Sequence, residues 1–220
     1  MNALVAYSIN ENNFVLSPER TILWEKQNTL IIADLHIGKS EHFRKSGIAV
    51  PQKVYKEDLQ RLFTQILYSK ADQLIIVGDL SHSRSNKEME IFKRWRNDFS
   101  SLSIRLVNGK PDILNDSWYE ELNITRSDNL LIDNFSFCHD PEDIKTSLTL
   151  KNPYTFSGHV HPGINIKGIG SQGMQFPCFY FKNSYAMLPA FSRFTDISKV
   201  APKKGDNVFA IVENELFQVQ

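Results

Sequence analysis

Two short apolar runs, each followed by an acidic residue, constrain the fold more than any other feature. Residues 29–33 read Thr-Leu-Ile-Ile-Ala and precede Asp34, and residues 73–77 read Gln-Leu-Ile-Ile-Val and precede Gly78-Asp79. Runs of this length and composition are typical of strands that are buried on both faces of a sheet. Open α/β sheets bind ligands beyond the carboxyl ends of such strands. The two runs therefore predict a buried sheet with a polar site at one edge.

The middle of the chain alternates between helical and strand patterns. Residues from Pro51 to about Ser69 place apolar side chains on one side at helical spacing. Further helices are expected at residues 86–99 and 116–122, and a strand is expected at residues 103–107.

Strand patterns joined by Gly, Pro and Asn turns dominate both ends of the chain. The N-terminal ones cover residues 4–9, 14–16 and 21–24. The C-terminal ones cover residues 129–132, 135–139, 154–157, 163–167, 176–181, 185–188 and 208–212. We therefore expect a single domain, residues 1–220, of the α/β (α+β) class, in which two stacked mixed β-sheets are flanked by helices.

Composition sets limits on partners and location. Lysine plus arginine number 25 and aspartate plus glutamate also number 25, so no global field attracts nucleic acid or anionic lipid. The N-terminus lacks the pattern of a signal peptide, and no apolar run approaches the roughly 20 residues of a membrane helix. We expect a cytoplasmic protein with no membrane partner. Cys138 and Cys178 are too few for a disulfide framework and are expected to be buried, reduced thiols.

Four short motifs place carboxylates and imidazoles directly after predicted strands. One such residue at a strand end is usually an ordinary polar residue, but four of the six histidines fall in this series. Carboxylate and imidazole are normal ligands of Zn, Mn and Fe, and clustered metal ions are typical of hydrolases. The series therefore predicts a divalent metal site made by Asp34, His36, Asp79, His139, His159 and His161.

The order of the motifs resembles that of the calcineurin-like metallophosphoesterases, whose pattern is D-x-H, G-D, G-N-H-D, H and G-H-x-H. Residues 38–51, 78–83, 177–179 and 188–191 are most similar to the bacterial ligase-associated DNA damage response branch of that family. Members of this branch are described as metal-dependent phosphoesterases or endonucleases encoded near a DNA ligase and a helicase. The resemblance implies the family's two-sheet sandwich, a phosphodiester substrate with DNA as the candidate, and a functional link to a ligase and a helicase.

The resemblance also implies roles for individual residues. Bound metal ions would activate a bridging water and hold the phosphate oxygens, so that no side chain becomes covalently attached. Asp79 would bridge the two sites and would share in catalysis with Asp34, His36 and His139. The first site would consist of Asp34, His36, Asp79 and His161, and the second mainly of Asp79, His139 and His159.

One motif of the family pattern is damaged. Residues 109–112 read Gly-Lys-Pro-Asp where the family has G-N-H-D, so Lys110 replaces a ligating Asn and Pro111 replaces a His that serves the transition state or the leaving group. A charged ammonium offers no acceptor to a cation, and proline has no side-chain proton to transfer. We therefore expect about one tightly held ion per chain rather than two, and reduced activity.

Three arrangements of the damaged turn remain open. Lys110 weakens the second metal site and leaves one ion, or Asn108 shifts inward and supplies a ligand, or Lys110 replaces the second cation by pairing with Asp79. The first leaves a slow phosphodiesterase, while the third leaves little or no chemistry. The alternative functions are accordingly a degenerate family member that binds DNA or a protein without catalysis, and a phosphatase of a small metabolite.

Further polar residues lie close to these motifs. Lys39, His42 and Arg44 follow the first motif, with Lys45 beside them, and are candidates for binding a phosphate or a nucleic-acid backbone. On charge alone they suit a solvated loop and helix start better, and the resemblance to the branch's loop makes the two interpretations about equal. His82 either replaces the missing proton donor or caps a loop. Arg193 is interpreted as a surface or packing residue, and the aromatic residues between 176 and 191 as sheet core.

Overall fold

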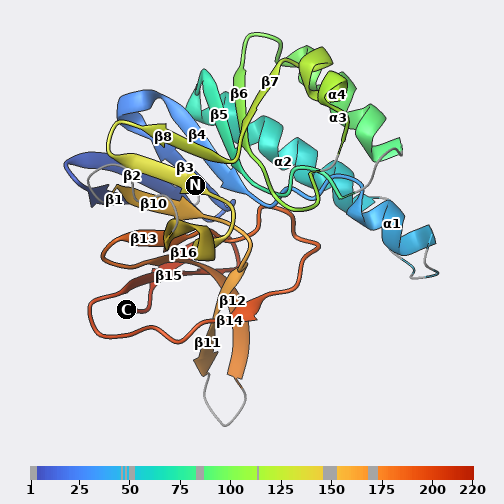
Figure 1. The fold of residues 1–220 in the computed structure, drawn as a ribbon. Helices are drawn as coiled ribbons and strands as arrows, with labels where there is room; N and C mark the ends of the chain where they lie inside the picture. Colours follow the sequence, from blue (N-terminus) through green and yellow to red (C-terminus); the bar gives the residue numbers. More distant parts are fainter. Residues whose placement is uncertain are drawn as a thin grey trace.

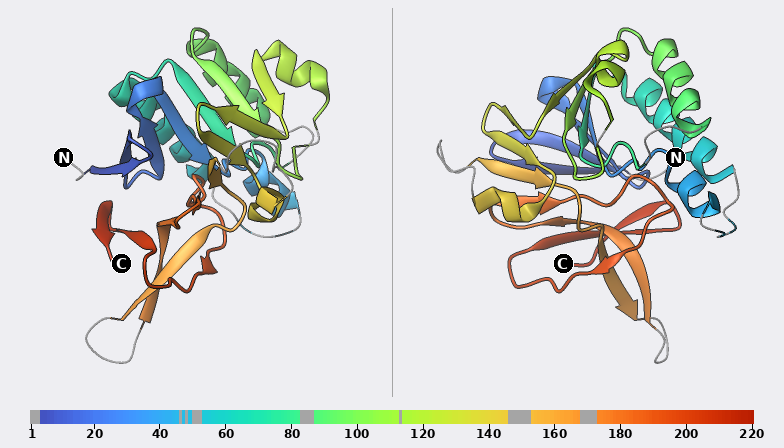
Figure 2. Two further views of the ribbon diagram at one scale, coloured as in Figure 1. Left: turned by 60° about the vertical axis from the view of Figure 1, so that its left-hand side comes forward. Right: turned by 45° about the vertical axis from the view of Figure 1, so that its right-hand side comes forward.

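Two stacked β-sheets form the body of the protein, with helices on the outer face of the first sheet (Figure 1). The computed structural model describes residues 4–45, 47, 49, 53–82, 87–112, 114–145, 153–167 and 173–220. The N-terminal half of the chain supplies the first sheet and the C-terminal half supplies the second, as two further views show (Figure 2). The predicted fold class, two mixed sheets with flanking helices, is confirmed.

The first sheet has seven strands that lie in sequence order. An antiparallel meander leads into a parallel half, and parallel neighbours require crossover connections, which here are helices. These helices are α2 (Lys53–Ser69), α3 (Lys87–Asp98) and α4 (Asp116–Glu121). The strands are β1 (Val5–Ile9), β2 (Asn12–Ser17), β3 (Thr21–Trp24), β4 (Thr29–Ala33), β5 (Gln73–Val77), β6 (Ser103–Val107) and β7 (Ile124–Ser127).

The second sheet has nine strands, in the order β14-β11-β12-β13-β10-β9-β8, with β15 paired to β12 and β16 paired to β15. Its centre is parallel, because β10 pairs in parallel with both β9 and β13. The hairpin of β11 and β12 extends away from the body (Figure 2). The strands are β8 (Asn129–Ile132), β9 (Phe135–Cys138), β10 (Tyr154–Ser157), β11 (Pro162–Lys167), β12 (Gly173–Phe181), β13 (Tyr185–Met187), β14 (Ser198–Lys199), β15 (Asn207–Val212) and β16 (Glu215–Gln218).

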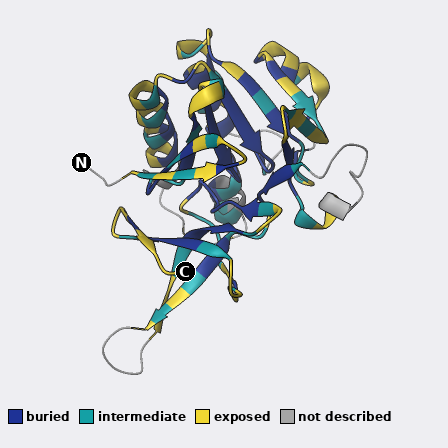
Figure 3. Cartoon of the chain, turned by 90° about the vertical axis from the view of Figure 1, so that its left-hand side faces the viewer, coloured by how far each residue is buried: buried dark blue, intermediate teal, exposed yellow. Residues whose placement is uncertain are grey.

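Strands β4 and β5 of the first sheet are buried on both faces, as their apolar runs predict. In β4, Leu30 and Ile32 pack toward the helices, whereas Ile31 and Ala33 pack toward the second sheet. The layer between the sheets is rich in phenylalanine, and Figure 3 shows the buried strands at the centre of the molecule. Because burial of a large apolar side chain contributes about 1.5–3 kcal/mol, this layer fixes how the two sheets stack. Its largest members are Trp24, Phe14, Phe135, Phe137, Phe156, Phe179 and Phe181.

Several elements were not expected from the sequence. These are β7, β14, β16 and two short 3-10 helices, whereas helix α1 (Lys39–Lys45) lies where the sequence suggested a solvated loop and helix start. The expected starts of two helices, at residues 51 and 86, lie outside the described residues. Cys138 and Cys178 are buried and unpaired, as predicted. Among the described residues, no helix is both long and apolar enough to cross a membrane.

Candidate metal site

The strand register of the first sheet brings the first two motifs together. Ala33 at the end of β4 lies opposite Val77 at the end of β5, so Asp34 and Gly78 leave neighbouring strands at the same level. The connection continues beyond the strands, because the Asp34 amide donates to the Gly78 carbonyl over 3.2 Å. The sequence predicts this convergence, since carboxyl ends of parallel strands meet at one sheet edge.

The second sheet contributes the other two motifs in the same way. Cys138 of β9 lies opposite Ser157 of β10, and the next residues, His139 and Gly158, are joined by a 3.1 Å backbone hydrogen bond. The two sheets meet here. The amide of Ser192 in the loop after β13 donates to the Asp34 carbonyl over 3.2 Å. The site is therefore built at one edge of the sandwich by loops from both sheets.

The backbone is strained at the predicted ligands. Positive φ angles occur at Asp34 (55°), His36 (53°), Asp79 (48°), His159 (65°) and His161 (48°), which are five of the six predicted ligands. Each such conformation costs about 1–3 kcal/mol in a residue other than glycine and persists only where surrounding structure enforces it. Strain of this kind concentrates at functional sites, so its position supports the assignment of the ligands.

The first group of possible metal ligands consists of Asp34, His36 and His161, whose ligand atoms all lie within 4.8 Å of one another. The Nε2 atoms of His36 and His161 face each other across 3.4 Å, and His161 Nε2 lies 3.7 Å from Asp34 Oδ2. Asp34 is fully buried, and His161 Nδ1 lies 3.1 Å from the carbonyl of Asp196, which orients its ring. Three donors thus converge on one small volume.

The second group consists of Asp34, Asp79 and His139. His139 Nε2 lies 2.9 Å from Asp34 Oδ1 and 3.4 Å from Asp79 Oδ1. Asp34 is therefore the residue common to both groups, whereas the family resemblance assigns the bridging role to Asp79. Asp79 nevertheless reaches the first group, because its Oδ2 lies 3.7 Å from His36 Nδ1.

His159 lies at the rim of the site. Its side chain is 45% exposed, and its Nε2 atom lies 3.8 Å from Asp140 Oδ2. The His159 ring nevertheless lies beside that of His139, with 5.1 Å between the ring centroids, and its backbone amide donates to Asp34 Oδ2 over 3.1 Å. The structure therefore places five predicted ligands together and the sixth next to them.

Electrostatics prepares the site for a cation. Burial raises the pKa of the Asp79 carboxyl to about 7; His139 opposes this rise, while Asp34 and Asp112 add to it. Burial lowers the pKa of the His36 imidazole to about 3, so the ring is neutral at physiological pH. Neutral imidazole is the form that binds metals. A nearby cation would favour the ionised form of the Asp79 carboxyl and the neutral form of the His36 imidazole, which are the forms that bind a metal.

Asp34 and His139 form a coupled pair. Burial opposes ionisation of Asp34, but its hydrogen bonds and charge interactions with His139 and His161 outweigh burial and hold its pKa below the ordinary value. Burial lowers the pKa of His139, but the hydrogen bond to Asp34 and the charges of Asp34 and Asp79 outweigh this effect and raise it. When the His139 imidazole takes up a proton, its positive charge partly compensates the Asp34 carboxylate, as a bound cation would.

The residues present fit a divalent transition metal. His36 Nδ1 and Asp79 Oδ1 are buried and have no hydrogen-bond partner. Buried polar atoms without partners are costly, at roughly 1–3 kcal/mol each, and require an explanation. A set of imidazole and carboxylate donors suits Zn, Mn or Fe. Both are donor atoms of the kind that a bound cation would engage.

Two glycines allow the strands and turns to approach the site closely. Gly78 has φ +79°, and a Cβ atom there would lie 2.0 Å from the His139 ring. A Cβ atom at Gly109 would lie 2.1 Å from Asp79 Oδ1. The damaged turn therefore still packs directly on Asp79. Asp112 holds the turn in place, because its carboxylate accepts hydrogen bonds from the amides of Ser81 (2.8 Å) and Gly109 (2.9 Å).

Lys110 does not enter the ligand cluster. Its side chain is 82% exposed, and its Nζ atom lies 3.7 Å from Asp140 Oδ2. The arrangement in which Lys110 pairs with Asp79 is therefore wrong, because the backbone of the turn directs this side chain outward to Asp140. Asn108 donates through Nδ2 to Asp128 (2.8 Å), and its Oδ1 atom is buried without a hydrogen-bond partner. A ligand role for Asn108 stays a prediction.

The predicted substrate-binding residues have different surroundings. Burial lowers the pKa of Lys39, and the carboxylates of Asp196, Asp79 and Asp34 oppose that shift, so Lys39 lies within electrostatic reach of the site. Arg44 lies farther along α1 and pairs with the buried Glu88 over 3.0 Å, which ties the helix to α3. The side chain of His42 lies outside the described residues.

His82 lies next to the first ligand group. Its ring is 5.9 Å from that of His36 between centroids, in an edge-to-face arrangement, and its amide donates to the carbonyl of Ile37 over 2.8 Å. The sequence interpretation did not identify the segment from Ser192 to Asp196 as part of the site. The one sequence feature near this segment is the Leu-Pro-Ala-Phe motif at residues 188–191, and a motif alone does not show which residues the segment contacts.

Comparison with solved structures identifies the fold. No protein-family model matches the chain, and no curated protein matches it. Among solved structures, the Pseudomonas putida nuclease MPE is similar with a TM-score of 0.82 and 23% identity, over 99% of this chain and 100% of that one. The E. coli phosphoesterase YfcE has a TM-score of 0.46 and 15% identity, over 87% of this chain and 97% of that one. The chain therefore has the fold of the nuclease along nearly its whole length.

Proposed function

We propose that this protein is a metal-dependent phosphoesterase that hydrolyses a phosphodiester, with DNA as the candidate substrate. The observation that carries the proposal is the pair of buried ligand groups, Asp34 with His36 and His161, and Asp34 with Asp79 and His139. The shared fold of a nuclease supports it. The link to a DNA ligase and a helicase remains an expectation from the sequence resemblance.

The chain's own residues would hold and orient the reacting groups. When bound, divalent ions would supply an activated water and stabilise charge on the phosphate. The first group would hold one ion through the neutral His36, the ionised Asp34 and His161. Asp79 and His139 would hold a second, with His159 at the rim. The backbone hydrogen bond from His36 to Asp79, 2.8 Å long, keeps the two groups in fixed relation.

The damaged turn affects the second group and the proton donor. With Asn replaced by Lys110, the second group lacks one ligand, and we propose about one tightly held ion per chain. With His replaced by Pro111, the leaving group loses its expected acid. Outside the predicted ligand set, His82 is the histidine whose side chain the structure describes, and we propose it as the alternative donor. Loss of a general acid commonly costs about 10²–10⁴ in rate, so slow turnover is expected.

A second candidate function rests on the same substitutions. A chain that lacks both the ligating Asn and the His has a reason to be inactive, and it would then bind DNA or a protein without catalysis. Against this, the strain at five ligands and the two buried atoms without hydrogen-bond partners are features that a pure binding protein does not need.

Metal content and hydrolysis test the proposal together. The purified protein, dialysed against a weak chelator and then supplied with Mn, is assayed by elemental analysis and with bis(p-nitrophenyl) phosphate. We expect about one ion per chain and slow hydrolysis. Asp34→Asn preserves the shape of a residue common to both groups, so it should lower metal content and reduce hydrolysis by roughly 10³-fold, the scale of several kcal/mol.

A matched control is Asp133→Asn, because Asp133 is an exposed aspartate that pairs with Lys26. This variant should behave as the wild type in both measurements. A wild type that binds no metal above the level of Asp34→Asn would refute the proposal. Metal binding without any hydrolysis would favour the degenerate binding protein.

A further inference from the structure

A small pocket lies beside the candidate metal site and has no assigned role. Its volume is about 150 Å³. It lies between the start of α1 and the loop that follows β13. Its lining combines basic, aromatic, hydroxyl and acidic side chains: Lys39, Phe43, Arg193, Phe194, Thr195 and Asp196.

The walls of the pocket are attached directly to predicted metal ligands. Ser192, which precedes the loop wall, donates from its amide to the Asp34 carbonyl over 3.2 Å. Asp196, at the other end of that wall, places its carbonyl 3.1 Å from His161 Nδ1. A group held in the pocket is therefore adjacent to the first ligand group.

The opposite wall has the same relation to the site. The amide of Lys39 donates to the carbonyl of His36 over 3.2 Å, which fixes the start of α1 against the ligand. The side chain of Lys39 is partly buried and lies within electrostatic reach of Asp34 and Asp79. An anionic group on a substrate in the metal site would therefore meet this ammonium on the pocket side.

Aromatic surface distinguishes this pocket from a plain anion site. Phe43 and Phe194 come from opposite walls and meet edge to face, with ring centroids 5.5 Å apart and ring planes at 90°. Aromatic rings accept the flat face or the edge of another ring and carry no preference for a phosphate. Both phenylalanines are only partly buried, so ring surface remains open to a ligand.

The polar residues also favour a ligand larger than phosphate. Asp196 would repel a bare phosphate, but its carboxylate and the Thr195 hydroxyl can pair with amino and hydroxyl groups. The guanidinium of Arg193 is already engaged, since its Nη2 atom lies 3.3 Å from Glu19 Oε2. Lys39 is then the principal cation facing a ligand, and the remainder of the lining suits a neutral ring bearing polar groups.

We propose that this pocket holds the nucleoside next to the scissile phosphodiester, so that the enzyme selects nucleotide esters over simple phosphate esters. The inference rests on the proposed phosphodiesterase function. The base would pack on Phe194 and Phe43, and Lys39 would face the phosphate. The pocket, at about 150 Å³, is smaller than the roughly 300–1,000 Å³ of pockets that enclose drug-sized ligands, so it would enclose the base and leave the sugar and phosphate toward the metal site.

Two substrates with the same leaving group test the proposal. Thymidine 5′-(p-nitrophenyl phosphate) carries a nucleoside, whereas methyl p-nitrophenyl phosphate carries only a methyl group. The wild type should prefer the thymidine ester in kcat/KM. Stacking of one base on an aromatic side chain is worth about 1–3 kcal/mol, so Phe194→Ala should reduce this preference by about 5- to 150-fold. Phe194→Tyr keeps the ring and should keep the preference.

The control is Phe217→Ala, because Phe217 lies on β16 and is 46% exposed. It should leave the preference as in the wild type. Phe43→Leu is a second pocket variant, with preserved bulk, that serves if Phe194→Ala melts at a lower temperature than the assay. A wild type that hydrolyses both esters with equal kcat/KM would overturn the proposal.

A binding measurement separates failure of the pocket from failure of the enzyme. If neither ester is hydrolysed, the proposed function has failed, and calorimetric titration with thymidine 5′-monophosphate and with inorganic phosphate decides about the pocket alone. Tighter binding of the nucleotide, lost in Phe194→Ala, supports the nucleoside pocket. Equal binding of the two ligands refutes it and leaves only an anion site.

Discussion

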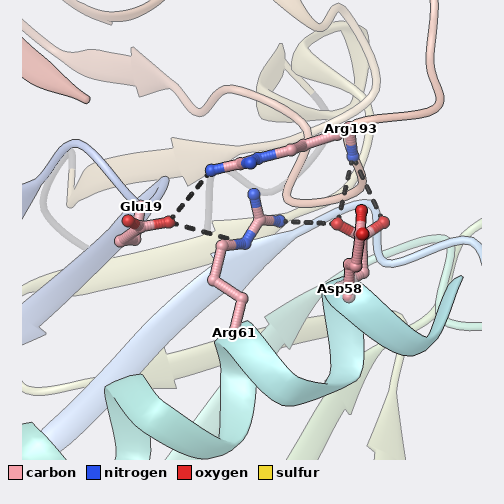
Figure 4. A pocket seen from close by; sticks show the side chains of 5 residues that line it. Glu19, Asp58, Arg61 and Arg193 are labelled. Atoms are coloured by element: carbon pink, nitrogen blue, oxygen red, sulfur yellow. Dashed lines mark hydrogen bonds and ion pairs between the residues drawn. The ribbon is translucent and has the colours of Figure 1, made fainter. Parts of the chain in front are cut away.

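Two clusters of buried charge lie on either side of the loop formed by residues 190–193. One is the candidate metal site around Asp34. The other is a network of Glu19, Asp58, Arg61 and Arg193 beside a cavity of about 370 Å³ (Figure 4). Asp58 is 3% exposed, so both clusters contain carboxylates that are almost inaccessible to water. They differ in the source of the compensating positive charge.

The second cluster obtains its cations from the chain. Arg61 Nη2 lies 3.0 Å from Asp58 Oδ1, and Arg61 Nε lies 3.8 Å from Glu19 Oε2. The amide of Arg193 donates to Asp58 Oδ2 over 3.2 Å. The Arg61 guanidinium also lies 4.1 Å from the ring centroid of Phe191. The sequence interpretation of Arg193 as a surface or packing residue omitted this network.

The metal-site cluster differs in the partners of its carboxylates. Among the described residues, Asp34 and Asp79 form ion pairs with histidines alone. Imidazole can bind a metal, whereas guanidinium has no acceptor and cannot. A structural charge cluster therefore differs from a metal site in its partners: guanidinium groups complete the first, whereas imidazole groups leave the second in need of a cation.

The two clusters are mechanically connected through the loop between them. Arg20 Nη1 donates to the carbonyls of Ala190 and Ser192, each over 2.9 Å. Ser192 in turn donates to the Asp34 carbonyl. Arg20, together with the Arg193 amide bound to Asp58, thus fixes the loop that supports Asp34, so folding and metal binding have to be measured separately.

The largest effect is expected from breaking the arginine network. Asp58→Ala would leave the buried Arg61 guanidinium without its nearest carboxylate, and breaking a buried ion pair in this way costs about 3–5 kcal/mol. Arg61→Met should cost less, because burial raises the pKa of Asp58 and its carboxyl can take up a proton. The double variant should cost less than the sum of the two. Urea denaturation measures all three free energies of unfolding.

The metal content of the same variants tests whether the two clusters are independent. At temperatures where they remain folded, they should bind as much Mn as the wild type, since none of the altered side chains is a predicted ligand. If Asp58→Ala retained wild-type stability and lost metal, the arginine network would belong to the metal site and the distinction drawn above would fail.

The sequence predicts one cluster far better than the other. Asp34 and Asp79 each follow a continuous apolar run that predicts a buried strand. Because the carboxyl ends of parallel strands lie at one edge of a sheet, the local sequence pattern is enough to predict that the two residues meet. The partners Arg61 and Glu19, or Arg20 and Ser192, lie on segments with no shared pattern. Their pairing depends on how the second sheet stacks on the first, which hydrophobic periodicity does not determine.

Backbone conformation and side-chain direction were likewise not predictable. The positive φ angles at Asp34 and His161 arise because both loops are tied to neighbouring segments after their strands end. One of the three arrangements left open by the sequence pairs Lys110 with Asp79. The long lysine side chain instead reaches water and Asp140, where its charge is hydrated. Sequence pattern fixes which turn meets the site, but not which way each side chain leaves it.

A smaller effect, on rate, is expected from repair of the damaged turn. Lys110→Asn with Pro111→His would restore a neutral acceptor and a proton donor next to Asp79, on a turn whose glycine already packs there. Hydrolysis of bis(p-nitrophenyl) phosphate with Mn should rise by about 10²-fold, the scale of one general acid. Metal content should rise toward two ions per chain. Each single change should fall short of the double.

Two outcomes of the repair would alter the interpretation of the metal site. Gain of metal without gain of rate would favour a binding protein whose pocket has changed around the turn. A wild type as fast as the double variant would show that the turn is not defective, and His82→Gln and Asn108→Ala would then identify the residues that compensate.

The smallest effect is expected from removing the Lys110 charge alone. If the metal site lacks a cation from the chain, Lys110→Ala should change little, because an exposed ion pair is worth about 0–1 kcal/mol and the Lys110 side chain is 82% exposed. The affinity for Mn, measured by titration of the metal-free protein, should change by less than about 5-fold. Lys204→Ala, at another exposed lysine, is the matched control. A large gain in affinity for Lys110→Ala alone would mean that the Lys110 charge acts on the ligand cluster through Asp140 and His139. The metal site would then, like the arginine network, contain a cation of its own, and the contrast between the two clusters would be one of degree.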